Sequence, residues 1–250
     1  MPATPDPDAP TRRTAAPGAA TRVRAAACAA MALAGCLSPT SGLAQSLCSS
    51  DGQPAARVLR ERFISADCES CWSDPRARAA ARSEVALDWI VASTRGADAA
   101  LSAAATRDAG WRLEGLGRAL AADTLELRSP VAGASGRLRV AHGLAFNGYI
   151  GTSISFTAGP RAPSGLSAWV ALVETIGAGT EGTPIERNLV RNTLQLQWNG
   201  PTAALANGQR GWSETRPMSI PEGARAERLR LVGWVQDRRG RILRLAQSHC

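Results

Sequence analysis

VLRERFIS at residues 58–65, ADCESC at residues 66–71 and VALDWIV at residues 85–91 are the stretches of sequence on which the expected fold depends. The first and third are short runs rich in apolar residues, and the third places an apolar residue at every second position, which is the period of a strand. Between them, residues 75–83 are rich in alanine and arginine and begin with a proline that follows an aspartate, so they predict a helix. A second alanine-rich helix is expected at residues 97–107. The order strand, helix, strand, helix predicts the opening of an α/β domain.

Beyond residue 130 the pattern changes to that of an all-β protein. A strand candidate ends at Ser129-Pro130, and the glycine- and serine-rich stretch that follows indicates a domain boundary. Later runs alternate or are continuously apolar between Gly, Pro and Asn turns, and they lie at residues 137–141, 152–156, 168–176, 193–198, 229–235 and 241–246. These runs predict a β-sandwich. The expected domains are therefore an α/β domain at residues 45–130 and a β-sandwich domain at residues 137–250.

Composition and charge narrow the class of protein. The chain has 250 residues, 44% of them hydrophobic, and beyond its N-terminal region no apolar run reaches the roughly 18 residues that span a bilayer. All 29 basic residues are arginine, and the net charge is +8. The arginines near the C-terminus lack the interleaved aromatic residues of a nucleic-acid surface, so we expect no nucleic-acid partner and instead a solvated strand face or an anionic envelope surface. The sequence has no phosphate-binding loop and no metalloprotease helix, and we expect neither a cofactor nor a metal.

The N-terminal residues predict export. Four arginines between residues 12 and 24 precede an alanine-rich apolar run at residues 25–37 and a polar stretch that ends in Gly-Leu-Ala, which is the order of a secretory signal. Residues 1–44 are therefore expected to be a signal peptide, and the mature protein is expected in the periplasm or outside the cell. Leu33-Ala34-Gly35-Cys36 also has the form of a lipobox. In that alternative Cys36 carries a lipid, the protein is anchored in the cell envelope, and only then does it contact a membrane.

Four cysteines, Cys48, Cys68, Cys71 and Cys250, remain in either mature form. An even number in an exported chain predicts two disulfides, for which three connectivities exist. The C-x-x-C spacing favours a local disulfide between Cys68 and Cys71, and the remaining pair, Cys48 and Cys250, would then join the two ends of the mature chain. Zinc is the rival use of four thiols, but structural zinc sites normally show two close pairs and this sequence has one.

Cys68 and Cys71 allow two interpretations, a redox pair and an inert structural disulfide. An exchanging cysteine needs a helix N-terminus or a cation beside its thiolate. Asp67 and Glu69 flank Cys68 instead, and their like charge disfavours a thiolate. The sequence therefore predicts a slow attacking thiol and a stable disulfide. Trp72, directly after the pair, is expected either to cover the disulfide or to offer a docking surface for an extended peptide.

Residues 61–71, ERFISADCESC, resemble the E-L-F-T-S-x-G-C-x-S-C-P-P-A-D signature of a family of exported bacterial thioredoxin-like proteins of unknown function. Four later segments are similar to that family's N-V-V-R, W-x-G, V-Q and G-x-V-L motifs, namely residues 188–191, 198–200, 235–236 and 240–243. Cysteines at the positions of Cys48 and Cys250 are also found in members. The resemblance covers most of the mature chain and is specific in the order of its motifs.

The sequence departs from that family at the positions redox chemistry would use. Trp72-Ser73-Asp74-Pro75 replaces the P-P-A-D segment, and Asp67 replaces a glycine. The T-P-Q segment that carries the counterpart of the thioredoxin cis-proline is represented at best by Ser129-Pro130, so Pro130 is the candidate for that proline. The resemblance implies an α/β plus all-β protein, a truncated thioredoxin-like domain followed by a β-sandwich domain, in a divergent member.

Two functions of different classes follow from these observations. The first is a non-enzymatic or vestigial thioredoxin-like envelope protein that binds another exported protein through its first domain. The alternative is a slow periplasmic thiol-disulfide oxidoreductase in which Cys68 attacks and Cys71 resolves the mixed disulfide. The carboxylates beside Cys68 favour the first.

Overall fold

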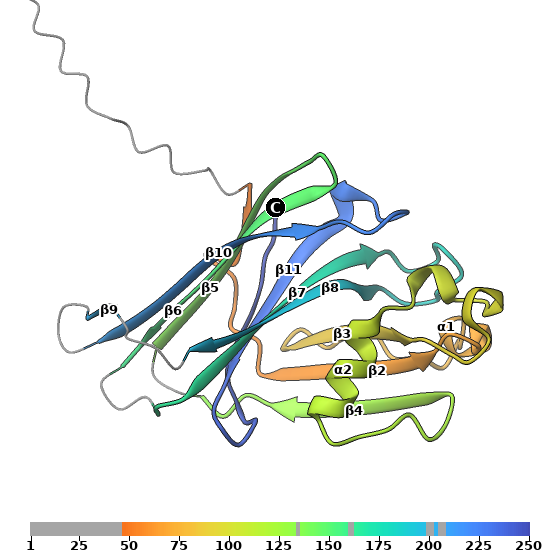
Figure 1. The fold of residues 1–250 in the computed structure, drawn as a ribbon, viewed down its shortest axis with the longest axis horizontal. Helices are drawn as coiled ribbons and strands as arrows, with labels where there is room; N and C mark the ends of the chain where they lie inside the picture. The colour runs from red at the N-terminus through yellow and green to blue at the C-terminus, as the bar shows by residue number, and fades with distance from the viewer. Residues whose placement is uncertain (1–46, 134–135, 160–162, 199–202, 205–208) are drawn as a thin grey trace, which may run out of the picture. The chain divides into compact units, whose positions relative to one another are not determined.

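The computed structural model describes residues 47–133, 136–159, 163–198, 203–204 and 209–250. Residues Gly42–Cys250 form one compact unit, and the other unit, Met1–Ser41, lies outside the described residues. The described chain consists mainly of β-strands in two sheets (Figure 1). The seven-stranded sheet has the order β12-β11-β7-β8-β3-β2-β4, and the five-stranded sheet has the order β1-β5-β6-β10-β9.

The strands and helices have the following bounds. The seven-stranded sheet contains β2 (Val58–Ser65), β3 (Glu84–Val91), β4 (Thr124–Pro130), β7 (Leu166–Ile176), β8 (Arg187–Trp198), β11 (Leu229–Gln236) and β12 (Ile242–Gln247). The five-stranded sheet contains β1 (Cys48–Ser49), β5 (Gly136–Phe146), β6 (Tyr149–Ala158), β9 (Ala203–Ala204) and β10 (Arg210–Ser219). The segments that connect these strands contain the helices α1 (Glu69–Trp72) and α2 (Arg107–Gly115) and the 3-10 turns η1 (Gly96–Asp98), η2 (Ser102–Ala104) and η4 (Ala226–Arg228).

The pairing of β3 with β8 joins early and late parts of the chain. β2 and β3 run parallel along their whole length, whereas β2 and β4 are antiparallel. β3 then meets β8 in parallel at a single register pair, Asp88 with Leu189. On the other side of β8, three antiparallel pairs follow in order: β8 with β7, β7 with β11, and β11 with β12. Asp88 therefore lies at the junction between the two halves of the seven-stranded sheet.

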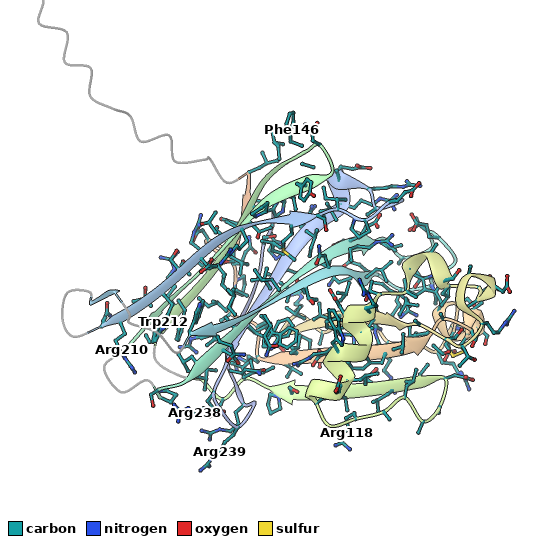
Figure 2. All side chains as sticks on the ribbon, viewed as in Figure 1. Arg118, Phe146, Arg210, Trp212, Arg238 and Arg239 are labelled. Atoms are coloured by element: carbon teal, nitrogen blue, oxygen red, sulfur yellow. A yellow bond between two sulfur atoms is a disulfide. The ribbon has the colours of Figure 1, made fainter. Side chains whose placement is uncertain are left out.

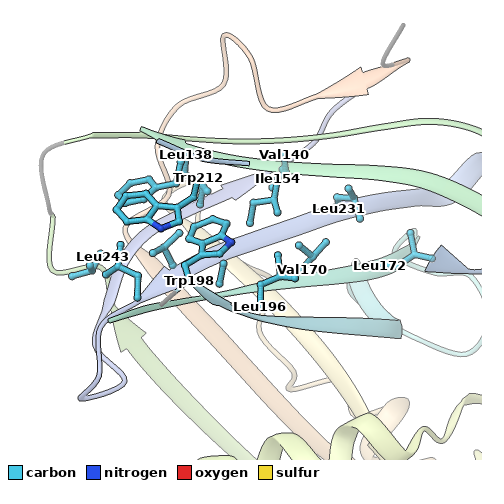
Figure 3. Packing of buried hydrophobic residues seen from close by; sticks show 14 of the residues in the cluster. Leu138, Val140, Ile154, Val170, Leu172, Leu196, Trp198, Trp212, Leu231 and Leu243 are labelled. Atoms are coloured by element: carbon cyan, nitrogen blue, oxygen red, sulfur yellow. The ribbon is translucent and has the colours of Figure 1, made fainter. Parts of the chain in front are cut away.

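The largest hydrophobic core fills the space between the two sheets (Figure 3). The five-stranded sheet contributes inward-facing residues such as Val140 and Ile154, and the seven-stranded sheet contributes Val170 and Leu231. Gly233 on β11 allows the sheets to approach closely, because a Cβ at this position would overlap Cγ1 of Val140. This arrangement of two packed sheets is β-sandwich-like, with alternating inward residues on both sides.

A second core lies on the other face of the seven-stranded sheet, under α2. Ala109 and Leu113 of α2 pack over Phe63, Trp89 and their neighbours on β2 and β3. β7 contributes to both cores, since Val170 and Leu172 face the first and Trp169 and Val173 face the second. All but one of its positions are buried, which explains why residues 168–173 at its centre are continuously apolar and do not alternate with polar residues.

The expected fold class is wrong. The structure is mostly β, and its first part is not an α/β thioredoxin-like domain placed before a separate sandwich. Strands from residues 58–65 and 84–91 share one sheet with β7, β8 and β11 from the later part of the chain. The sequence pattern could not show this, because the contact between β3 and β8 joins residues about a hundred positions apart.

The two helices expected after the first strands are also wrong. Residues 75–83 contain only turns and irregular structure, and nearly every position is exposed. Without an apolar face to bury, alanine-rich sequence gains too little to form a short helix. Residues 97–107 form the turns η1 and η2, and the helix α2 starts only after Thr106, whose hydroxyl accepts a hydrogen bond from the amide of Ala109.

Several strands agree with the sequence patterns at their centres. β2, β7, β11 and β12 lie at the runs expected to form strands, and β11 and β12 pair antiparallel as a hairpin that closes around residues 237–240. Arg238 and Arg239 in this turn are exposed and point outward from the fold (Figure 2). β10 was not expected, because its sequence RGWSETRPMS is mostly polar and buries only two residues.

Candidate functional site

The Cys68–Cys71 disulfide is formed, and it lies at one end of the seven-stranded sheet. β2 ends at Ser65, and the cysteines follow across a tight turn in which the amide of Cys68 donates to the carbonyl of Ser65 at 3.0 Å. Cys71 belongs to the four-residue helix α1, and Cys68 is its N-cap. The helix therefore lies earlier in the chain and is shorter than the one expected at residues 75–83, and it includes the second cysteine.

The two cysteines differ in their exposure. Cys68 is 8% exposed, whereas Cys71 is partly exposed. Cys71 lines a small hollow of about 150 Å³, and Cys68 does not. We call this space the Cys71 hollow; its other charged lining residues are Arg62, Asp74, Arg78, Glu126 and Arg187.

The carboxylates near Cys68 are partly neutralised. Asp67 accepts a hydrogen bond from the hydroxyl of Ser93 at 3.1 Å and lies 3.6 Å from a guanidinium nitrogen of Arg95. Glu69 is exposed to solvent. A carboxylate that the sequence analysis missed, Asp123, lies within 4.8 Å of both sulfurs. It precedes β4 and reaches the disulfide because its carbonyl accepts from the amide of Ser65 at 2.8 Å.

A buried charge cluster lies behind α1. Asp88 on β3 is fully buried, and Arg62 and Arg187 both bind it, with nitrogen–oxygen distances of 2.7 and 2.8 Å. Arg187 also donates to the carbonyl of Trp72 at 2.7 Å and to the hydroxyl of Thr183 at 2.8 Å. Burial lowers the pKa of Arg187, and the charge of Asp88 opposes that shift. The guanidinium remains a cation, since arginine does not deprotonate in proteins.

Sequence reasoning missed this cluster, although one signal was present. Asp88 interrupts a run that is otherwise apolar, so its burial could be inferred from the strand pattern. A buried carboxylate requires a cationic partner. The identity of that partner could not be inferred, because Arg187 lies 99 positions away along the chain.

Trp72 is buried rather than exposed as a docking surface. It is 7% exposed, its indole nitrogen donates to the carbonyl of Glu181 at 2.8 Å, and the guanidinium of Arg187 lies 4.6 Å from the ring centre. The ring belongs to a third core cluster together with Ile90, Ile176 and Leu189. Trp72 therefore anchors α1 to the body of the protein.

A second hollow, of about 260 Å³, is lined by residues of this third core cluster. We call it the Trp72 hollow; its lining residues include Trp72, Ile90, Leu101, Ile176, Leu189 and Ala104. Charged residues line it as well. Arg191 is held by Glu174 at 2.6 Å and Glu181 by Arg228 at 2.5 Å, whereas Glu222 has no ion pair among the described residues. The hollow therefore combines apolar walls with an available negative charge.

The Cys48–Cys250 disulfide is also formed, which is the pairing expected once the C-x-x-C spacing assigns Cys68 to Cys71. The bond joins residues 202 positions apart, and β1 beside it exchanges two backbone hydrogen bonds of 2.9 Å between Ser49 and His249. A nitrogen of His142 lies within 4.8 Å of both sulfurs. Burial lowers the pKa of His142, although hydrogen bonding to the carbonyl of Gly143 partly opposes this. Sulfurs joined in a disulfide offer no thiolate to a metal, so in this oxidised form neither cysteine pair is a metal site.

The other predicted site residues have different outcomes. Pro130 lies at the end of β4, paired with Val58 at the start of β2, whereas the disulfide follows the other end of β2. The structure therefore does not bring Pro130 to the cysteines. Cys36 and the expected signal peptide, residues 1–44, lie outside the described residues.

Both disulfides are compatible with a secreted or extracellular protein. In the part of the chain that the structure describes, no helix is long and apolar enough to span a membrane.

Comparisons with known proteins give little further information. No family model matches the sequence, and no curated protein matches it. Among solved structures, HBP35 of Porphyromonas gingivalis is similar over 77% of this chain and 74% of that chain, with a TM-score of 0.44 and 7% sequence identity.

Proposed function

We propose that this chain is an exported binding protein that engages an extended segment of another exported protein through the Trp72 hollow. The observation that supports this most directly is the hollow itself, whose apolar walls are open to solvent beside α1. Concave apolar sites with a few polar groups are the usual form of a binding site. The disulfides support the exported location.

The lining of the Trp72 hollow suggests the chemistry of its ligand. Ile90, Leu101 and Leu189 offer contact to one apolar side chain. Glu222 is exposed at the same hollow and is free to pair with a cation. A partner segment with an apolar residue next to a lysine or arginine would fit both features.

A library of random nine-residue peptides displayed on phage tests this proposal. Peptides selected on the wild-type protein should carry an apolar residue beside a basic one. Their affinity should fall at least tenfold when Ala104→Phe fills the hollow, and Glu222→Lys should weaken the basic peptides in particular. Ala80→Phe is the matched control, because Ala80 is exposed and does not line the hollow. Selected peptides that bind all three variants equally would overturn the proposal.

A second function, thiol-disulfide exchange, is favoured by a different observation. Cys71 is partly exposed and lines its own hollow, so an incoming thiol has access to the disulfide. Incubation of the wild-type protein in glutathione buffers of defined ratio, followed by mass spectrometry, tests it. Reversible reduction of the pair at physiological ratios would support exchange. A pair that stays oxidised and unmodified would overturn thiol-disulfide exchange, and the binding function would be the one that remains.

A further inference from the structure

The two cysteines of the Cys68–Cys71 disulfide differ in their exposure to solvent. Cys68 is 8% exposed, whereas Cys71 is partly exposed and is the member of the pair that lines the Cys71 hollow. The rate of thiol-disulfide exchange depends on which sulfur is attacked and on access to it. We propose that Cys71, and not Cys68, is the sulfur through which this protein exchanges with thiols, and that Arg62 and Arg187 stabilise its thiolate. This inference rests on the second function proposed above and reverses the roles expected from the sequence.

The buried charges behind Cys71 carry a net positive charge. Two guanidiniums, of Arg62 and Arg187, share the single carboxylate of Asp88, and none of the three residues is more than 8% exposed. The cluster therefore has a net charge of about +1, and buried charges are screened by salt less than exposed ones. Arg187 binds the carbonyl of Trp72, the residue next to Cys71, which places its charge close to that cysteine. A nearby cation is what lowers the free energy of a cysteine thiolate.

The remaining charged groups of the Cys71 hollow change this balance little. Asp74 is paired with Arg76 at 3.1 Å. Arg78 and Glu126 are exposed and have opposite charges. Asp123 lies within 4.8 Å of both sulfurs, so its carboxylate disfavours both thiolates and does not distinguish between them.

Cys68 has the opposite surroundings. It is the more buried cysteine, it follows Asp67 and precedes Glu69 in the chain, and it does not line the hollow that Arg62 and Arg187 line. Its polar side-chain contact is with the hydroxyl of Ser70 at 3.5 Å. Burial disfavours a thiolate at Cys68, and the carboxylates of Asp67 and Glu69 add like charge that the ion pair of Asp67 with Arg95 reduces only in part.

The exchange follows a balanced two-step reaction with a dithiol of another protein. A substrate thiolate attacks Sγ of Cys71, the Cys68–Cys71 bond breaks, and Cys68 leaves as a thiolate that takes a proton from water. The second substrate thiolate attacks the substrate sulfur of the mixed disulfide, which forms the substrate disulfide and releases Cys71 as its thiolate. Two electrons pass from the dithiol to the protein. In the reverse direction the Cys71 thiolate attacks a substrate disulfide and Cys68 resolves it.

Two single-cysteine variants separate the roles of the two sulfurs, with the Cys48–Cys250 disulfide left intact. Cys68→Ser leaves Cys71 as the free thiol, and Cys71→Ser leaves Cys68. With iodoacetamide at pH 7, Cys71 should alkylate at least tenfold faster than Cys68, and its rate should reach half its maximum at a lower pH. With oxidised glutathione, the Cys68→Ser variant should accumulate the mixed disulfide and the Cys71→Ser variant should not.

Variants of the arginines test the source of the reactivity in the Cys68→Ser background. Arg62→Met and Arg187→Met should each slow alkylation of Cys71 at pH 7 by about tenfold, because removal of one guanidinium leaves a neutral pair with Asp88. Arg78→Met is the control, since Arg78 lines the same hollow but is exposed, and it should leave the rate unchanged within about twofold. Far-ultraviolet circular dichroism identifies any arginine variant that fails to fold, and the comparison of the two cysteines does not depend on these variants.

The outcomes distinguish the inference from the function on which it rests. If Cys71→Ser forms the mixed disulfide and Cys68→Ser does not, exchange stands and the assignment of Cys71 is overturned. If neither variant forms it, thiol-disulfide exchange itself is overturned together with the role of Cys71. If Cys71 exchanges but its alkylation rate is the same with and without Arg62 or Arg187, the electrostatic part of the inference is overturned.

Discussion

Removal of the Cys48–Cys250 disulfide should cost this protein far more stability than removal of the Cys68–Cys71 disulfide. The first bond closes a loop over a sequence separation of 202, and the second spans a separation of 3. Cys48 is 1% exposed, and β1 beside it pairs with β5 and with His249. The perturbation is the double substitution Cys48→Ala and Cys250→Ala, and the matched control is Cys68→Ala with Cys71→Ala.

The expected magnitudes follow from the entropy of closing each loop in the unfolded chain. For the long loop the estimate is about 5 kcal/mol, and for the short loop it is about 2 kcal/mol. Both are upper figures, because residual structure in the unfolded chain reduces the entropy that the loop model assigns to each bond. The difference of about 3 kcal/mol between the two variants is the quantity to measure.

Urea unfolding followed by tryptophan fluorescence provides the measurement, since the chain has seven tryptophans. Both double variants should show one cooperative transition, with the Cys48/Cys250 variant unfolding at clearly lower urea. Similar losses in the two variants would refute the reasoning, because they would show that the terminal bond does not restrict the unfolded chain in proportion to its loop. A larger loss in the Cys68/Cys71 variant would refute it too.

Three further perturbations test the packing and the buried charges. Glu61→Gln should cost about 3–5 kcal/mol in urea unfolding, because Arg112, which binds Glu61 at 2.8 Å beneath α2, would lose its buried counter-charge. Gly233→Ala should cost about 1–3 kcal/mol in the same assay, because the new methyl group would overlap Val140 of the facing sheet. Lowering the pH below the ordinary histidine pKa of 6.5 should reduce the free energy of unfolding by up to about 1.4 kcal/mol per pH unit, and His142→Gln should remove that dependence.

The sign of the pH effect follows from burial. Because burial lowers the pKa of His142 in the folded protein, the unfolded chain takes up a proton first as the pH falls. The contribution of neutral His142 to the free energy of unfolding is therefore complete above pH 6.5, and it is lost as the pH falls below 6.5. His249→Gln is the control, since His249 is exposed, and a wild-type curve that stays flat between pH 7.5 and 5.5 would contradict the prediction.

Two controls accompany the packing variants. Gly110→Ala lies on α2 with nothing within 4 Å of the new methyl group, so it should leave stability unchanged or raise it by up to about 1 kcal/mol. A double variant, Glu61→Leu with Arg112→Met, should recover much of the loss caused by Glu61→Gln, because it removes both buried charges. Equal losses in the single and double variants would show that packing, and not the ion pair, determines the effect.

The cysteines were the part of the candidate site that the sequence predicted. The even number of cysteines and the C-x-x-C spacing can be read directly from the sequence, and the structure confirms both disulfides. The reactivity expected from Asp67 and Glu69 took no account of Arg62, Asp88 and Arg187, which come from three separate strands. Electrostatic surroundings depend on distances in space, and the sequence gives only distances along the chain.

Local sequence patterns were enough to predict where the main strands lie and to favour the disulfide pairing that the structure shows. Apolar runs, their alternation and the turn residues between them depend on neighbours within a few residues, and they identified β2, β7 and β11. The pairing of β3 with β8, the irregular structure of residues 75–83 and the greater exposure of Cys71 than of Cys68 could be known only from the folded chain. The physical reason is that a helix or a strand is stable only when its apolar face is buried, and burial is set by segments that are distant in the chain.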